Sequence, residues 1–263
     1  MSAAVPTMAI VMPAYNEHER IGLTLEAIAR YAARSGAALP ILVGDDGSTD
    51  DTGRYALAVA ARLGLALEVR SFPHRGKALT VRDAMLDAAD RFGVEYLLML
   101  DADNEISIGQ LDGVAWQKDP ATIYIGRRVA TANGTSGTRP ALVRRVMSSG
   151  MRTASRLLLG MRYPDTQCGF KLFPRALVTD LFRQQTTSSW VFDAEILTIA
   201  GRVSGLPICE IPVTWAPRGA SRVRATAAVP SFLALLGVAA RLWSRRYRPL
   251  CLPAASASER PGA

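Results

Sequence analysis

The first hundred residues alternate strictly between short apolar runs and longer helical patterns, and few folds accommodate that order. The apolar runs are AIVMP at 9–13, PILVGDD at 40–46, ALEVRS at 66–71 and YLLMLDAD at 96–103. Between them, at 18–34, 51–63 and 77–92, apolar residues recur three and four apart, as on one face of a helix. This alternation predicts an α/β fold: a mainly parallel central sheet flanked by helices on both faces, with right-handed crossovers.

Composition limits the kinds of disulfide and metal site that such a domain can contain. The 263 residues contain three cysteines in no CxxC pair, so neither a disulfide framework nor a thiolate zinc site is indicated. His18 and His74 are the two histidines, so a metal would have to be held mainly by oxygen. The N-terminus lacks the pattern of a signal peptide, and we expect a cytoplasmic protein.

Each of the four predicted strands ends in polar residues. They are Pro13-Ala14-Tyr15-Asn16-Glu17, Asp45-Asp46-Gly47-Ser48, His74-Arg75-Gly76-Lys77 and Asp101-Ala102-Asp103. Parallel strands bring such segments to one sheet edge, where ligands of α/β proteins bind. Neither of the two common glycine-rich phosphate motifs occurs. Phosphate groups would then be held through Mg²⁺ or Mn²⁺, which binds one or two carboxylates together with substrate phosphates, and Asp101 and Asp103 are the candidate ligands.

Positive charge is concentrated in one stretch. Residues 121–164 contain eight arginines, no lysine and no acidic residue, and the rest of the chain is balanced, so the net charge of +8 can be assigned to this stretch. The cluster indicates an anionic partner, with a solvated basic face as the alternative. Only Tyr124 and Tyr163 lie there, too few to stack on a nucleic acid, so we expect no nucleic-acid partner. Phosphate on a small molecule or a lipid fits better.

Five ordered blocks of sequence resemble a known family. They are VMPAYNE, VGDDGSTDDT, LMLDADNE, DTQCGFKLF at 165–173 and WVFDAEIL at 190–197. Together, over about residues 8–215, they resemble family 2 glycosyltransferases with the Rossmann-like GT-A fold, and most of all the branch of dolichyl-phosphate glucosyltransferases and polyprenyl-phosphate mannosyltransferases. The resemblance implies an inverting, metal-dependent transfer of a hexose, by preference glucose from UDP-glucose, to a polyprenyl or dolichyl phosphate.

The resemblance also implies roles for individual residues. Those that would bind the nucleotide sugar are Pro13, Ala14, Tyr15, Glu17, Asp46, Lys77, Asp101, Ala102 and Asp103, with Asp46 at the base or ribose. The implied metal ligands are Asp101, Asp103 and Glu105, and the implied acceptor-binding residues are Arg127, Arg144, Ser221 and Arg222. The implied catalytic residues are Asp103, Arg127, Arg144 and Asp193. Gly169 and Phe170 would shape the sugar pocket, and Asp193 and Glu195 occupy the place of a general base in relatives with hydroxyl acceptors.

The nature of the acceptor decides whether a base is needed. A phosphate monoester has a second pKa of about 6, so it is largely dianionic at neutral pH and attacks unaided. A hydroxyl would need a base such as Asp193. The arginine-rich stretch favours a phosphate, because a guanidinium binds phosphate in a bidentate manner. The structural alternative for Asp193 is a carboxylate that caps or orients a helix or pairs with one of those arginines.

The C-terminal region has the composition of an interfacial helix. Sixteen uncharged residues from Ala225 to Ala240 precede four arginines, Trp243 and Tyr247. That run is shorter than the roughly 20 residues that span a bilayer, so we expect peripheral contact with the anionic inner face of the cell membrane, or a helix packed on the protein itself. The expected division is a GT-A domain at 1–220, an amphipathic helix at 221–250 and a disordered tail at 251–263.

Other functions stay open at this stage. A family 2 enzyme could take GDP-mannose as its donor or a soluble hydroxyl as its acceptor. The fold could also serve nucleotide binding or membrane scaffolding without catalysis. A phosphotransferase or nucleotidyltransferase is disfavoured by the missing phosphate loop.

Overall fold

The computed structural model describes residues 5–129, 142–217 and 228–250. The strands are β1 (Met8–Ala14), β2 (Ile41–Asp45), β3 (Leu67–Ser71), β4 (Tyr96–Leu100), β5 (Ile123–Val129), β6 (Phe170–Pro174) and β7 (Ile208–Thr214). The helices are α1 (His18–Ser35), α2 (Thr52–Leu63), α3 (Lys77–Arg91), α4 (Leu142–Leu159), α5 (Arg175–Phe182), α6 (Phe192–Leu197) and α7 (Ala228–Trp243), with a 3₁₀ segment η1 (Ile108–Gly113) and a π-helical segment η2 (Thr198–Val203).

The strands form one mixed sheet in the order β3-β2-β1-β4-β6-β5-β7. The first four strands are mutually parallel, β6 is antiparallel to β4 and β5, and β7 is parallel to β5. The predicted mainly parallel sheet is therefore confirmed. Register pairs Ala14 with Asp45 and Asp45 with Ser71, so β1, β2 and β3 end side by side at one sheet edge.

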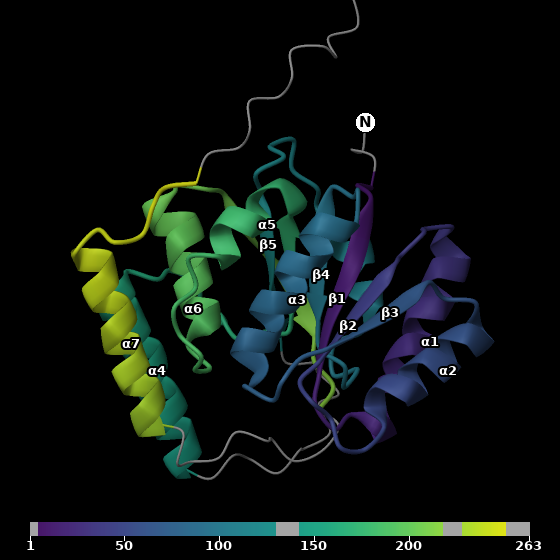
Figure 1. The fold of residues 1–263 in the computed structure, drawn as a ribbon. Helices are drawn as coiled ribbons and strands as arrows, with labels where there is room; N and C mark the ends of the chain where they lie inside the picture. The colour runs from purple at the N-terminus through teal and green to yellow at the C-terminus, as the bar shows by residue number, and fades with distance from the viewer. Residues whose placement is uncertain (1–4, 130–141, 218–227, 251–263) are drawn as a thin grey trace, which may run out of the picture.

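Helices cover both faces of the sheet (Figure 1). Along β1 the side chains alternate, because Ala9 and Val11 pack against one layer while Ile10 and Met12 pack against the other. The first layer contains α3, α5, α6 and α7, and the second contains α1, α2 and η1. All five residues of β4 are buried, which explains its continuous apolar sequence. The strand stops at Leu100, so the carboxylates that follow lie beyond its end.

The C-terminal region packs against the body of the protein. Leu235, Val238 and Ala239 of α7 belong to the core on the α3 side of the sheet, and α7 lies beside α4 (Figure 1). The chain then returns to α6, where the Tyr247 hydroxyl donates to Glu195 Oε1 at 2.7 Å. Within the described residues, no helix combines the length and hydropathy that a membrane span requires.

Candidate active site

The loops after β1 and β2 are bonded to each other. Ser48 Oγ accepts from Asn16 N at 3.0 Å, and Asn16 Oδ1 accepts from Thr49 N at 2.8 Å. One turn further along, Thr52 Oγ1 accepts from Glu17 N at 2.8 Å. Two of the predicted polar clusters therefore form one rigid unit at the carboxyl edge of the sheet.

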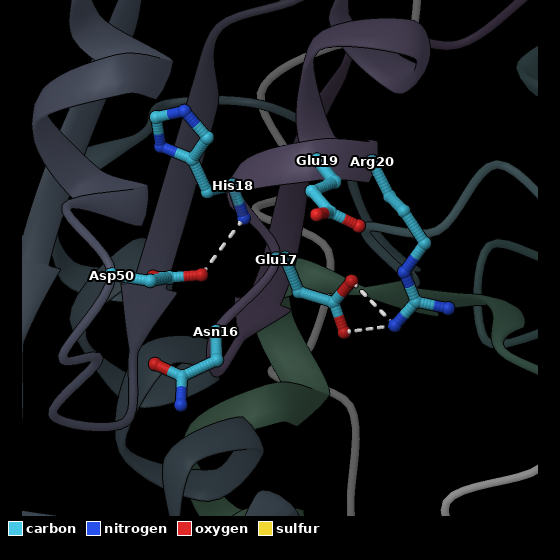
Figure 2. A pocket seen from close by; sticks show the side chains of 6 residues that line it. All are labelled: Asn16, Glu17, His18, Glu19, Arg20 and Asp50. Carbon is cyan, nitrogen blue, oxygen red and sulfur yellow. Dashed lines mark hydrogen bonds and ion pairs between the residues drawn. The ribbon is translucent and has the colours of Figure 1, made fainter.

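A cavity of about 370 Å³ opens between these loops and the first turn of α1. Its lining consists of Asn16, Glu17, His18, Glu19, Arg20 and Asp50. Figure 2 shows Glu17 and Arg20 pointing toward each other across one side of it, and their ion pair measures 2.6 Å. On the other side, His18 N donates to Asp50 at 3.2 Å (Figure 2). The cavity is polar, lies where ligands of parallel sheets bind, and has the volume of a small-molecule site.

Asp46 organises the next loop. Its buried carboxylate accepts from Arg75 N at 2.9 Å, Gly76 N at 3.0 Å and Thr80 Oγ1 at 2.7 Å. The His74 ring, stacked on Tyr15 at 4.2 Å between centroids, lies 2.9 Å from the same carboxylate. Asp46 thus holds the β3–α3 turn in place, and its predicted contact with a base or ribose would have to be made from that position.

Lys77, the first residue of α3, joins the third polar cluster to the fourth. Its ammonium lies 2.6 Å from Asp101 Oδ1, and both side chains are about one-quarter exposed. Burial alone would raise the pKa of Asp101, but the charge and hydrogen bond of Lys77 outweigh it and leave the pKa below its ordinary value. All four polar clusters are therefore gathered at one edge, as predicted from the parallel strands.

Asp103 lies beside Asp101, but its negative charge is less well balanced by neighbouring groups. Burial and the neighbouring charge of Asp101 raise its pKa. The guanidinium of Arg20, on α1, lies 4.0 Å from its carboxylate. The turn itself is fixed by Thr24 Oγ1, which donates to Ala102 O at 2.7 Å, and by Glu105 N, which donates to Asp103 Oδ1 at 3.1 Å. A carboxylate under this like-charge strain gains most from an added cation.

The predicted metal ligands fit a cation that is shared with a substrate. Among residues 5–129, 142–217 and 228–250, no three His, Cys, Asp or Glu side chains gather as a ready-made metal cluster. The donors at this turn are nevertheless hard carboxylate oxygens, of the kind that Mg²⁺ and Mn²⁺ prefer. Gly169 allows the Asp101 carboxylate to lie close against the backbone, since an added Cβ there would lie 2.1 Å from Asp101 Oδ2. Asp103, with Asp101 or Glu105, could hold one ion whose other ligands are diphosphate oxygens and water.

A second, smaller cavity of about 40 Å³ lies at the carboxylates themselves. Its lining is Leu100, Asp101, Asp103, Glu105, Ile106, Arg128, Gln167, Gly169 and Trp215. Arg128 binds Asp165 through two guanidinium contacts of 2.8 Å each. That ion pair raises the pKa of Arg128 and leaves the pKa of Asp165 below its ordinary value, despite the burial that would raise it. A fixed guanidinium and the three acidic side chains therefore face one small space.

Asp193 and Glu195 are engaged within the protein. Asp193 lies 2.7 Å from the ammonium of Lys171, a β6 residue that is itself 1% exposed and donates to Cys168 O. Burial raises the pKa of Asp193, and the Lys171 charge opposes that shift. Glu195, fully buried, accepts from Thr186 N and Thr187 N at 3.0 Å each, as well as from Tyr247.

The remaining predicted residues fall in three groups. Pro13 and Ala14 lie at the buried end of β1, and Phe170 is part of the core, next to Gly169. Arg127 is half-buried on β5, but the small cavity is lined by Arg128 instead. The side chain of Arg144, together with Ser221 and Arg222, lies outside the described residues.

Sequence reasoning missed several residues of this site, four of which bear on its charge and hydrogen bonding. Arg20, Arg128, Lys171 and Trp215 each contact a predicted site carboxylate or line its cavity. For Arg128 a signal was present, because successive residues of a strand face opposite sides and Arg127 and Arg128 cannot both face the cavity.

Comparison with known proteins now identifies the family. The profile described as Glycosyl transferase family 2 matches residues 9–182. Dolichyl-phosphate beta-glucosyltransferase of Saccharomyces cerevisiae is 32% identical over 227 residues, and the human protein of that name is 28% identical over 223 residues. Both alignments cover 79% of this chain, and they cover 66% of the yeast and 67% of the human protein. The chain thus spans about two thirds of the length of these relatives, and slightly less for the yeast protein.

Solved structures agree on the fold. Glucosyl-3-phosphoglycerate synthase of Mycobacterium tuberculosis, in complex with Mn²⁺ and UDP-glucose, superposes with a TM-score of 0.62 at 17% identity, covering 90% of this chain and 80% of that one. Mannosyl-3-phosphoglycerate synthase of Rubrobacter xylanophilus gives a TM-score of 0.56 at 17% identity, covering 97% and 80%. The resemblance noted from the five sequence blocks is confirmed: this chain has the GT-A fold and belongs to glycosyltransferase family 2.

Proposed function

We propose that this protein transfers glucose, with inversion, from UDP-glucose to a polyprenyl or dolichyl phosphate. The observation that carries the proposal is the gathering of Asp101, Asp103 and Glu105 with Arg128 at one cavity edge, in a chain 32% identical to the yeast dolichyl-phosphate glucosyltransferase. The Mycobacterium tuberculosis structure cited above, with a TM-score of 0.62, was solved in complex with UDP-glucose and Mn²⁺, which supports the choice of donor.

In the proposed complex the nucleotide occupies the larger cavity and its neighbouring loops. Asn16, Glu17 and Arg20 line that cavity, and Asp103 lies 4.0 Å from Arg20 at its inner side. The diphosphate would therefore extend from the loops after β1 and β2 toward the carboxylates beyond β4. The sugar would then lie beside the small cavity that Asp101 and Gly169 line.

The reaction exchanges one bond at the anomeric carbon. An oxygen of the acceptor phosphate forms the new bond, while the bond to the diphosphate oxygen breaks and its electron pair leaves with UDP. Positive charge develops on the sugar ring and negative charge on the departing diphosphate. A bound Mg²⁺ or Mn²⁺, held by Asp103 with Asp101 or Glu105, would supply electrostatic stabilisation of that negative charge. Lys77 supplies a second positive charge from the first turn of α3.

The state of Asp193 supports a phosphate rather than a hydroxyl acceptor. A general base must reach the proton that it abstracts, whereas the Asp193 carboxylate is buried and bound at 2.7 Å to Lys171. A phosphate dianion carries no proton that must be removed. The fixed guanidinium of Arg128, with Arg144 as its predicted partner, suits an anionic acceptor.

A lipid acceptor also gives a role to the outer face of α7. Five large apolar residues of α7 are exposed: Val229, Phe232, Leu233, Leu236 and Trp243. Leu157 of the adjacent α4 is 79% exposed. This face, followed by Arg241, Arg245 and Arg246, has the composition of an interfacial helix, and we propose that it contacts the anionic inner face of the cell membrane. The division into a GT-A domain at 1–220 and a C-terminal helix region at 221–250 stays part of this proposal.

The membrane contact can be tested by itself. Leu233→Asp and Phe232→Ser should lower co-sedimentation with anionic vesicles, because each removes exposed apolar surface without touching the core. Leu57→Asp, which changes an exposed leucine of α2, is the matched control. Equal vesicle binding by all the variants would refute the contact and leave the catalytic proposal intact.

The function is tested by release of nucleoside diphosphate from UDP- and GDP-sugars, with Mn²⁺ or Mg²⁺, with and without a short polyprenyl phosphate in detergent. Release that requires both UDP-glucose and the lipid phosphate would support donor and acceptor together. Preference for GDP-mannose would correct the donor. Slow release that ignores the lipid would overturn the phosphate acceptor in favour of a soluble hydroxyl.

A further inference from the structure

The end of β7 is bonded to the turn that carries the metal carboxylates. Ala216 N donates to Glu105 O at 2.9 Å, and Trp215 Nε1 donates to Glu105 Oε2 at 2.8 Å. Thr214 N, one residue earlier, donates to Gln110 Oε1 at 3.2 Å. Three successive residues of one segment are therefore bonded to this turn and to the following η1, which lie more than 100 residues earlier in the sequence.

The indole of Trp215 is held on its face as well as at its N–H. The Arg128 guanidinium carbon lies 5.6 Å from the ring centroid, within the range of a cation–π contact. Arg128 is in turn fixed by its two contacts to Asp165. The ring cannot swing away from Glu105 without losing the Arg128 contact, so the direction of its N–H is set.

The exposure of Trp215 is informative. The residue is 40% exposed, and it lines the same small cavity as Asp101, Asp103 and Glu105. A tryptophan that serves packing alone is buried more completely, whereas a tryptophan with a polar task keeps its N–H bonded and its edge near solvent. The one polar atom of its side chain, Nε1, donates a hydrogen bond to a carboxylate of the predicted metal site.

We propose that Trp215 is a positioning residue of the metal site: its N–H fixes the plane of the Glu105 carboxylate and so aims that carboxylate at the ion shared with the diphosphate. The inference rests on the metal-dependent function proposed above. Carboxylates that bind metals are commonly oriented by a second hydrogen bond, and loss of the partner weakens metal binding about 10- to 100-fold.

The first test is Mn²⁺ binding by the whole protein in the presence of UDP, followed through the electron paramagnetic resonance signal of unbound Mn²⁺. Trp215→Phe keeps a ring under Arg128 and removes the N–H. We expect its Mn²⁺ affinity to fall about 10- to 100-fold, with a melting temperature, measured without metal, close to that of the wild type. Trp243→Phe, which removes an exposed indole from α7, should bind Mn²⁺ like the wild type.

A double-mutant cycle separates positioning from a general structural effect. If Trp215 acts through Glu105, then Trp215→Phe should weaken binding no further in a Glu105→Ala background. Glu105→Asp breaks the same contact from the other side by shortening the side chain, and it keeps the inference testable should Trp215→Phe not fold. Its Mn²⁺ affinity should fall by a similar factor.

Failure of this inference is distinguishable from failure of the proposed function. Wild-type binding of Mn²⁺ with equal binding by Trp215→Phe would overturn the inference alone. Additive losses in the cycle would also overturn it, because they would show that Trp215 does not act through Glu105. A wild type that binds no Mn²⁺ with UDP would overturn the metal site, and this inference with it.

Discussion

Two pairs of acidic residues, each with one residue between its members, lie near each other in this site and differ in almost every physical respect. Asp101 and Asp103 follow β4, and their side chains are 29% and 24% exposed. Asp193 and Glu195 lie on α6, where the Asp193 side chain is 8% exposed and Glu195 is fully buried. The first pair is open to a ligand, whereas the second is enclosed.

The two pairs also differ in the groups that surround their carboxylates. Glu195 accepts backbone bonds from Thr186 and Thr187 and a hydroxyl bond from Tyr247, so its carboxylate is hydrogen-bonded inside the protein. Asp103 lies 4.0 Å from the guanidinium of Arg20 and has the like charge of Asp101 beside it. The same i, i+2 spacing thus gives a candidate binding site where solvent reaches it and a structural anchor where protein surrounds it. Spacing alone does not reveal which.

The largest effect that this contrast predicts is on the open pair. Asp103→Ala should lower glucosyl transfer about 10³-fold or more, because a cation held there stabilises the charge that develops on the leaving diphosphate. Turnover is measured as UDP release with the lipid phosphate present, and folding as the thermal transition. Asp112→Ala, at an exposed aspartate that pairs with Arg34, should change neither. An Asp103→Ala protein that is folded and fully active would end the metal argument.

The enclosed pair should instead control stability. Lys171→Met leaves the buried carboxylate of Asp193 without its cation and should lower the free energy of unfolding by about 3–5 kcal/mol, measured by urea denaturation. Combining it with Asp193→Asn should restore part of the loss, since no uncompensated charge is left. Losses that simply add in the double variant would contradict the pairing.

Asp193→Asn by itself separates the two roles considered for this residue. With a phosphate acceptor we expect turnover to fall less than tenfold, that is, by less than about 1.4 kcal/mol in the barrier. A general base would be revealed by a loss of about 10²- to 10⁴-fold. The rate should be measured at a temperature where denaturation data show the variant folded. A loss in the larger range would favour a hydroxyl acceptor. Asp193 would then act on the reaction itself, as proposed for Asp103.

Much of the fold was predictable because local pattern and tertiary structure agree in the first half. The strand and helix periods place β1 to β4 and α1 to α3 within a few residues of their observed ends. Once the strands are parallel, the polar residues that follow them must converge, so Lys77 and Asp101 could be expected near each other before the structure was known.

The pairings of the second half carry no such local signal. Trp215 and Glu105 are 110 residues apart, and Arg128 and Asp165 are 37 apart. Lys171 faces Asp193 only because β6 runs antiparallel between β4 and β5 and brings its buried side toward α6. The sequence block at 165–173 indicates a family. It does not indicate which of its side chains are buried or which residues they contact.

The smallest expected effect concerns the hydrogen bond from Tyr247 to Glu195, which anchors the segment after α7. It tests whether Glu195, like Asp193, has only a structural role. Burial raises the pKa of Tyr247, so its hydroxyl stays protonated and donates to Glu195 at 2.7 Å. Tyr247→Phe removes one of several bonds to a charged group and should lower the free energy of unfolding by about 1–2 kcal/mol, with turnover unchanged once the protein is folded. Tyr55→Phe, where the ring stacks on His18, should cost less. A loss of turnover in Tyr247→Phe without a loss of stability would instead show that the segment after α7 acts on the reaction through α6, because Glu195 and Asp193 share that helix.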